Sequence, residues 1–312
     1  MSAEEQAIVT GFGPTNAPTA GTLSVLLKTL NLQRSIGCDA EIIVSDLGAF
    51  LSRNKSWHEL QDLTDVFLSF IRDLAGDTPK VQIRSHIDKD NLSISSFVNE
   101  HILDTPAFLA NKEATELLYD ELGLLGSRLG VIADSTYTVS DIIKPFFKGS
   151  IVASSIHSRR RVLVIAGVEE HYFPRLARIA LTRLTDEFGD AYTPSVDINV
   201  SALYTRLIPG FAPYPKMSKS IPASGLFLDD DESTIFRKIL ETGTDVDRCV
   251  IEMICQASNW SAEEISAAKH AFNFATTDTE TWRKTKLRYA ETFCGFAASW
   301  SKAKGTSRAL AS

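Results

Sequence analysis

The sequence predicts an α/β fold, in which a Rossmann-like doubly wound parallel sheet is followed by a C-terminal all-helical domain. Two observations predict it. Short apolar or β-branched runs alternate with longer helical patterns over most of the chain, and no convincing strand follows residue 228. With 312 residues, 44% of them hydrophobic, the chain is long enough to bury a large core. We therefore expect a sheet-containing domain over residues 1–228 and a helical domain over residues 229–312.

Five runs have the composition and length of buried strands. They are QAIVTG (6–11), EIIVSD (41–46), KVQIRSH (80–86), RVLVIAG (161–167) and SVDINVS (195–201). Because helical patterns separate them, these runs are expected to form a parallel sheet with crossover helices. The clearest crossover covers residues 21–35, and Gly37 is predicted to end it. Residues 91–130 are predicted to be a helical insertion between the third and fourth strands.

The C-terminal domain is predicted to contain helices only. Residues 233–240, 246–257 and 262–272 each have a helical pattern. In the last helix, six side chains recur at helical intervals, namely Trp282, Lys286, Tyr289, Phe293, Phe296 and Trp300. We interpret this aromatic stripe as a packing surface, and a contact between one of its rings and a ligand or a base is the alternative.

The charge distribution bears on nucleic-acid binding. A net charge of −7 argues against a protein that coats nucleic acid non-specifically. From residue 281 onward, however, seven basic residues accompany a single acidic one, Glu291. This basic segment is either a solvated helix face or a phosphate-binding surface, and composition does not decide between the two.

The cysteine, histidine and hydropathy patterns argue against a disulfide-linked protein, a structural zinc protein and a membrane protein. The four cysteines occur singly and the six histidines lack ligand spacing, so neither disulfides nor structural zinc is expected. No apolar run approaches the length of a bilayer span, and the first residues, MSAEEQ, are acidic where a secretion signal would be basic. The sequence therefore predicts a cytoplasmic protein with reduced thiols and no membrane segment.

The first predicted strand leads into GFGPTNAPTAGTL (11–23), a glycine- and threonine-rich loop that opens directly into a helix. Such a loop offers a phosphate free backbone N–H groups, hydroxyl groups and the positive end of a helix dipole. Its glycines would let the backbone or an adenine ring approach closely. The loop has neither the P-loop nor the dinucleotide glycine pattern, so by itself it is weak evidence.

A second loop, FAPYPKMSKSIP (211–222), supplies the cationic charge that the first loop lacks. Lys216 and Lys219 flank Ser218 in a segment that its prolines make extended or loop-like. Lysines on such a loop can contact a polyphosphate while it reacts, which stabilises the transition state more than the ground state. The two loops together predict a triphosphate site.

With both loops in view, the chain resembles the class I aminoacyl-tRNA synthetases. KMSKS (216–220) is the signature of that class without a mismatch, and GFGPTNAPTAGT is similar to its G-x-x-P-[ST]-x-x-x-H-x-G-H loop. The positions in register with that loop are Gly11, Pro14, Thr15 and Gly21. Thr19 and Thr22 replace its two histidines.

Three further stretches narrow the resemblance to the tryptophanyl and tyrosyl branch, with tryptophanyl members the most similar. They are EIIVSDLGAFLSRN (41–54), AGVEEHYFPRLARIALTRL (166–184) and KMSKSIPASGLFLDDDESTIFRKI (216–239). The departures fall where the amino acid is expected to bind. Glu169 and Glu170 stand where the family has Asp-Gln, and Ser155 aligns with an aspartate that accepts the indole N–H in bacterial tryptophanyl enzymes.

The resemblance implies an aminoacyl-tRNA ligase, most like a tryptophan–tRNA ligase. Such an enzyme activates an amino acid with ATP through an aminoacyl-adenylate and transfers it to tRNA. Two alternatives stay open: a synthetase paralogue that uses a non-tRNA acceptor, and a binding module that has lost catalysis. Mg²⁺ is expected to accompany ATP without a protein carboxylate cage, and relatives of this branch suggest a homodimer. The candidate contacts to tRNA phosphates are Arg159, Arg160, Arg161 and the basic residues of 281–308.

Three groups of candidate site residues follow. The residues expected to act in catalysis are Lys216, Lys219, Thr19 and Thr22. Those expected to bind ATP are Gly11, Gly13, Thr15, Gly21, Met217 and Ser218. Those expected to bind the amino acid are Phe12, Asp46, Ser155, Gly167, Glu169 and Glu170. For the two glutamates, the alternative is an ion pair with neighbouring arginines.

Overall fold

The computed structural model describes residues 6–46, 49, 56–85, 161–170, 174, 199–211, 214–218 and 221–310. The predicted insertion over 91–130 lies outside these residues, as do Ser155, Arg159, Arg160 and Lys219. The chain divides into two compact units. The first comprises Met1–Pro14, Leu32–Thr64 and Asp77–Thr205, and the second comprises Thr15–Asn31, Asp65–Gly76 and Arg206–Ser312. The units are thus interleaved in sequence, and the division into domains over residues 1–228 and 229–312 stays a prediction.

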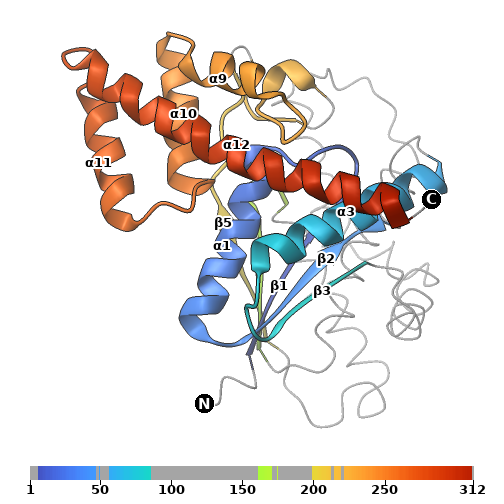
Figure 1. The fold of residues 1–312 in the computed structure, drawn as a ribbon. Coiled ribbons are helices and arrows are strands. Elements are labelled where there is room, and N and C mark those ends of the chain that lie inside the picture. Colours follow the sequence, from blue (N-terminus) through green and yellow to red (C-terminus); the bar gives the residue numbers. More distant parts are fainter. Residues whose placement is uncertain are drawn as a thin grey trace, which may run out of the picture. The chain divides into compact units, whose positions relative to one another are not determined.

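Five parallel strands form the sheet of the first unit (Figure 1). They are β1 (Gln6–Phe12), β2 (Asp39–Val44), β3 (Val81–Ser85), β4 (Arg161–Gly167) and β5 (Asn199–Thr205). Their order is β3-β2-β1-β4-β5, and all four pairings are parallel. Because the first strand is central and the chain adds strands first on one side and then on the other, this is the doubly wound order. The predicted Rossmann-like fold class is confirmed.

Four of the predicted strands agree with the observed strands to within two residues, but the fifth was placed too early. The predicted run over 195–201 overlaps β5 only at its end, and the strand continues to Thr205, which pairs with Gly167 of β4. The alternation that marked the run continues through Ala202 and Tyr204. An alternating pattern determines which side chains share a face, whereas pairing with β4 determines where the strand ends.

The two helices that follow β1 and β2 are α1 (Ala20–Ile36) and α3 (Trp57–Ala75). Gly37 ends α1 as predicted, because its φ of 71° is left-handed and its N–H donates to Gln33 O at 2.7 Å. The sequence interpretation expected a crossover helix between these strands but did not give the bounds of α3. Its signal was a capping box, in which the Ser56 and Glu59 side chains accept from each other's backbone N–H groups at 3.3 and 2.9 Å.

The second unit contains the C-terminal helices, whose prediction is confirmed. They are α9 (Glu232–Leu240), α10 (Thr244–Gln256), α11 (Ala262–Asn273) and α12 (Thr279–Leu310). The long helix α12 packs against α9 and α11, and α10 packs against α11 (Figure 1). The aromatic stripe of α12 is a packing surface, since Trp282, Tyr289, Phe293 and Trp300 are all 3% exposed or less. No helix among the residues described has both the length and the apolar character needed to cross a bilayer.

Ion pairs occupy most of the basic side chains from residue 281 onward. The pairs are Lys284 with Glu280, Lys286 with Asp247, Arg288 with Glu264, Lys302 with Asp73, and Lys304 with Asp229. Lys286 is buried at 4% exposure, and its Nζ also donates to Glu241 O at 3.0 Å. Five of the seven basic residues therefore have an acidic partner within the chain. This favours a packed and solvated helix face over a phosphate-binding surface.

Cys249 makes stability depend on pH in the alkaline range. Its Sγ–H donates to Pro209 O at 3.1 Å, and burial raises the pKa of the thiol from 9.0 to about 12. Between these values the unfolded chain has lost a proton that the folded chain keeps. The free energy of unfolding should therefore fall as pH rises through this window, by up to about 1.4 kcal/mol per pH unit, and show no such slope below it.

Urea unfolding of the wild type and Cys249→Ala at about pH 8, 9 and 10 would test this slope. The cavity left by the substitution is the same at every pH, so it cancels when the two proteins are compared across pH. The wild type is expected to lose stability relative to the variant as pH rises. A difference that stays constant over this range would show that the thiol does not titrate as described.

Candidate active site

One group of predicted site residues lies where strands β1 and β2 end in the first unit. Phe12, the last residue of β1, pairs with Val44, the last residue of β2, and Ser45 N–H donates to Phe12 O at 2.7 Å. Asp46 follows and is buried, with 4% of its surface exposed. Gly11 lies against β2, because a Cβ atom there would be 3.3 Å from Ile43 O. Strand packing alone thus favours a glycine at position 11.

The end of β4 carries the other described members of this group. Gly167 closes β4, and the 3-10 helix η3 (Val168–Glu170) follows directly, with Glu170 half-buried. Both glutamates are thus in η3, although only the backbone of Glu169 is described. In open α/β sheets, ligands bind outside the carboxyl ends of the strands. Phe12, Asp46, Gly167 and Glu170 all come from that edge of the sheet.

In the second unit, residues 221–230, here called the bridging segment, contact the first loop at the start of α1. Three backbone contacts join them: an antiparallel bridge between Thr19 and Phe227, a hydrogen bond from Ala20 N to Leu226 O of 3.3 Å, and one from Leu228 N to Pro18 O of 3.0 Å. The bridging segment thus fixes the entry into α1 by main-chain contacts on both sides of Thr19.

The two threonines that replace the family's histidines are buried at this entry. Thr19 is 4% and Thr22 7% exposed, and Thr19 Oγ1 accepts from Thr22 N–H at 3.4 Å. That contact makes Thr19 the N-cap of α1. Thr15, which precedes both threonines, and Gly21, which lies between them, are half-buried. Capping accounts for a hydroxyl at position 19, and a phosphate contact from either threonine stays a prediction.

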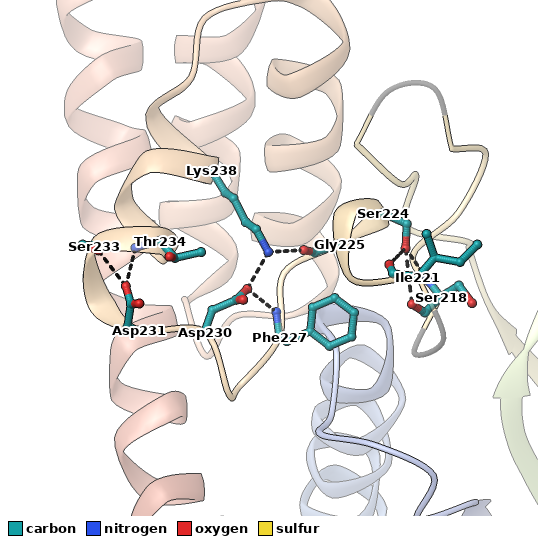
Figure 2. A network of polar contacts seen from close by, with 10 residues as sticks. All are labelled: Ser218, Ile221, Ser224, Gly225, Phe227, Asp230, Asp231, Ser233, Thr234 and Lys238. Atoms are coloured by element: carbon teal, nitrogen blue, oxygen red, sulfur yellow. Dashed lines mark hydrogen bonds and ion pairs between the residues drawn. The ribbon is translucent and has the colours of Figure 1, made fainter. Parts of the chain in front are cut away.

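The bridging segment also holds the KMSKS loop (Figure 2). Ser224 Oγ accepts from Ser218 N–H at 2.8 Å and donates to Ile221 O at 2.7 Å, while Ile221 N–H donates to Ser218 O at 3.0 Å. Met217 is 9% exposed and lies over Gly225, where a Cβ atom would be 2.9 Å from Met217 Cγ. The start of the KMSKS loop therefore rests on residues that also reach the start of α1.

The predicted residues thus fall into two groups, one in each unit. The first unit holds Gly11, Phe12, Gly13, Asp46, Gly167 and Glu170, and the second holds Thr15, Thr19, Gly21, Thr22, Lys216, Met217 and Ser218. Sequence reasoning used Ser224 only as a mark of similarity and overlooked Asp230 and Lys238. Their signal was present as opposite charges on either side of a helix start, but surface pairs of this kind are common.

Comparison with known proteins shows which families and folds this chain is similar to. Residues 175–295 match the sequence model of the family described as tRNA synthetases class I (W and Y). No curated protein matches the sequence. The structure is similar to the solved tryptophanyl-tRNA synthetase from Aeropyrum pernix K1, with a TM-score of 0.68 and 16% identity over 98% of this chain and 81% of that chain.

Two further solved structures are similar. The tryptophanyl-tRNA synthetase from Encephalitozoon cuniculi, bound to tryptophan, has a TM-score of 0.65 and 17% identity over 96% of this chain and 79% of that chain. The tyrosyl-tRNA synthetase from Aeropyrum pernix has a TM-score of 0.64 and 15% identity over 96% of this chain and 85% of that chain.

The chain therefore has the fold of a class I aminoacyl-tRNA synthetase. The family match and the similar structures confirm the resemblance to the tryptophanyl and tyrosyl branch of that class. Because tryptophanyl and tyrosyl enzymes are both among the similar structures, the comparisons do not distinguish one amino acid from the other.

Proposed function

We propose that the protein activates an amino acid with ATP through an aminoacyl-adenylate and transfers it to tRNA, as a tryptophan–tRNA ligase does. The observation that carries the proposal is the bridging segment. Within one unit it contacts both the first loop, at the start of α1, and the beginning of the KMSKS loop. These are the two elements expected to bind a triphosphate, and they lie far apart in the sequence.

The first loop and the KMSKS loop offer different contacts to ATP. The N-terminus of α1 provides backbone N–H groups and the positive end of its dipole. Lys216 and Lys219 provide positive charge, and Gly21 and Met217 are assigned to the nucleotide. Among the described residues, no group of three or more Asp, Glu, His or Cys side chains could hold a metal ion. Mg²⁺ is expected to accompany the triphosphate and to be held chiefly by phosphate oxygens and water, as the resemblance implies.

The first chemical step is a displacement at the α-phosphorus. The amino acid's carboxylate oxygen forms a bond to that phosphorus, the bond to the bridging oxygen of the β-phosphate breaks, and pyrophosphate leaves. A carboxylate is already ionised at neutral pH, so the step requires no general base. Catalysis then depends on positioning and on positive charge near the phosphates. Asp46, Gly167 and Glu170 are assigned to the amino acid, whose ammonium group a carboxylate can bind.

Amino-acid-dependent exchange of pyrophosphate into ATP tests this first step. We expect exchange with one of the twenty standard amino acids, with tryptophan the first to try because the sequence resembles tryptophanyl members most. Exchange with none of them would remove the proposed function.

Lys216→Ala should lower the kcat of this exchange by about 100-fold or more, because it removes a charge that acts on the reacting phosphates. The side chain is half-buried on a loop, so the fold should survive. Lys284→Ala is the matched control, since its side chain is 71% exposed in a surface ion pair and should leave kcat unchanged. Equal kcat values for the two variants would show that Lys216 has no catalytic role.

A second function has a specific observation in its favour. Five of the seven basic residues from 281 onward pair with acids of the chain, which leaves less charge there for tRNA. A paralogue that transfers the aminoacyl group to a smaller acceptor needs no such surface. Gel-shift binding to total tRNA at several salt concentrations separates the two, because phosphate contacts make affinity fall steeply with salt. Exchange activity without tRNA charging would favour the paralogue.

A further inference from the structure

We propose that Lys238 of α9 is a positioning residue that holds both signature loops in place through the bridging segment. This inference rests on the proposed function and adds to it a residue that lies outside both loops. Two kinds of contact support it. Lys238 makes two hydrogen bonds to the bridging segment, and the bridging segment in turn contacts both loops.

Lys238 points at the bridging segment (Figure 2). Its Nζ donates to Gly225 O at 2.8 Å and to Asp230 Oδ2 at 2.8 Å, and it lies 5.6 Å from the centre of the Phe227 ring. The Lys238 and Asp230 side chains are only 14% and 18% exposed. The pair is thus largely shielded from water. An ammonium and a carboxylate attract each other more strongly in such a site than at a fully exposed surface.

Asp230 accepts a hydrogen bond from Lys238 and also closes a turn. Its Oδ2 accepts from Phe227 N–H at 2.9 Å, and its own N–H donates to Phe227 O at 3.1 Å. The neighbouring acid has a different role, since Asp231 Oδ1 accepts from Thr234 N–H at 2.7 Å and caps α9. One acid therefore begins the helix that carries Lys238, and the other binds its ammonium group.

One of the two groups that Lys238 binds, the Gly225 carbonyl, lies between the contacts to the two loops, and the other, Asp230, follows them in the chain. On one side of the Gly225 carbonyl, Ser224 holds Ser218 of the KMSKS loop. On the other side, residues 226–228 hold residues 18–20 at the start of α1. Loss of the ammonium would leave the Gly225 carbonyl and the Asp230 carboxylate without this partner in a site of low exposure. The segment would then rearrange, and both loops would lose the support that they share.

A purely structural role for Lys238 predicts something different. Helix α9 has its own N-cap at Asp231 and buries Ile235 and Ile239, so its stability does not depend on Lys238 alone. If Lys238 only stabilised the fold, its loss would lower global stability and leave the kinetics of the folded protein unchanged. The positioning role predicts changes at both loops together, and in kcat.

Three variants of the full chain separate these roles. Lys238→Met removes the charge and keeps the length of the side chain, while Lys238→Arg keeps the charge. Arg237→Met is the matched control, because it removes a positive charge from the exposed adjacent position of the same helix. The first measurement is amide hydrogen exchange, which reports on the two loops without any assumption about activity.

In Lys238→Met, the amides of Ala20, Ser218 and Leu228 are expected to lose protection by about tenfold or more relative to the amides of α11. Arg237→Met should leave all of them as in the wild type. The inference is overturned if Lys238→Met leaves the loop amides unchanged, or if protection falls equally throughout the second unit.

The second measurement is pyrophosphate exchange. For Lys238→Met, kcat should fall by about 100-fold while KM for the amino acid stays within about twofold, and Lys238→Arg should recover part of the loss. A wild type with no exchange would remove the proposed function, and hydrogen exchange would then decide whether Lys238 holds the loops. An active wild type with an equally active Lys238→Met would remove this inference and leave the proposed function intact.

Discussion

Replacing Gly210 with alanine is expected to lower the kcat of amino-acid-dependent pyrophosphate exchange by about 100-fold. A Cβ atom at this position would lie 2.6 Å from Lys216 O, 2.8 Å from Lys216 C and 2.8 Å from Tyr214 O. These are backbone atoms, so no change of rotamer can relieve the contacts. The segment that carries Lys216 has to move, and the charge assigned to the phosphates moves with it. The free energy of unfolding should fall by about 1–3 kcal/mol as well.

Gly295→Ala is the matched control for this substitution. Gly295 lies in α12, and a Cβ atom there would meet nothing within 4 Å. Since alanine is favoured over glycine inside a helix by about 1 kcal/mol, this variant should keep full activity and unfold at the same or a higher temperature. Exchange kinetics and thermal unfolding of both variants provide the test. If Gly210→Ala kept kcat within about twofold of the wild type, the close approach would have no functional consequence.

Replacing Trp300 with alanine is expected to lower the free energy of unfolding by about 3–5 kcal/mol. The side chain is 1% exposed and joins α12 to the last part of α3 in the second unit. Its ring meets Phe67 and Phe70 edge to face, with centroids 5.0 and 5.5 Å away. Its Nε1–H donates to Asp229 Oδ1 at 2.8 Å. The substitution removes a large buried volume together with this hydrogen bond.

Equilibrium unfolding in urea, followed by circular dichroism, measures this loss. Trp300→Phe retains an aromatic ring without the N–H group, so its stability should lie between those of the wild type and Trp300→Ala. Phe274→Ala is the control for loss of an aromatic side chain, because Phe274 is 50% exposed and its loss should cost no more than about 0.5 kcal/mol. A loss below about 1 kcal/mol for Trp300→Ala would contradict the packing described.

Local patterns were sufficient for most elements of the fold. The apolar runs that became β1 to β4 are bounded by polar residues, and the end of α1 depends on one glycine that adopts a positive φ. Such features act within a few residues, so they can be read without knowing the partners. The end of β5 could not be obtained in this way, and the bounds of α3 were not assigned. The end of β5 depends on pairing with β4, and the bounds of α3 were overlooked although its capping box was present in the sequence.

The chemistry of the candidate ATP site also follows from sequence, because glycine, threonine and lysine have the same donors and charges wherever they lie. Sequence alone thus determined the fold class and the resemblance to class I synthetases, whereas the assignment of the two loops to the triphosphate stays a prediction. Sequence did not determine that Thr19 caps α1, that Lys286 is buried in an ion pair, or that most basic side chains of α12 have acidic partners.

Only the tertiary structure decided how the two loops are held. The hydrogen bonds of Ser224, Asp230 and Lys238 join residues that local sequence did not single out from the many other polar and oppositely charged pairs. Whether an ammonium group binds a phosphate, a carboxylate or water depends on which groups lie within about 3 Å of it. That distance is set by the packing of α9 and the path of the bridging segment.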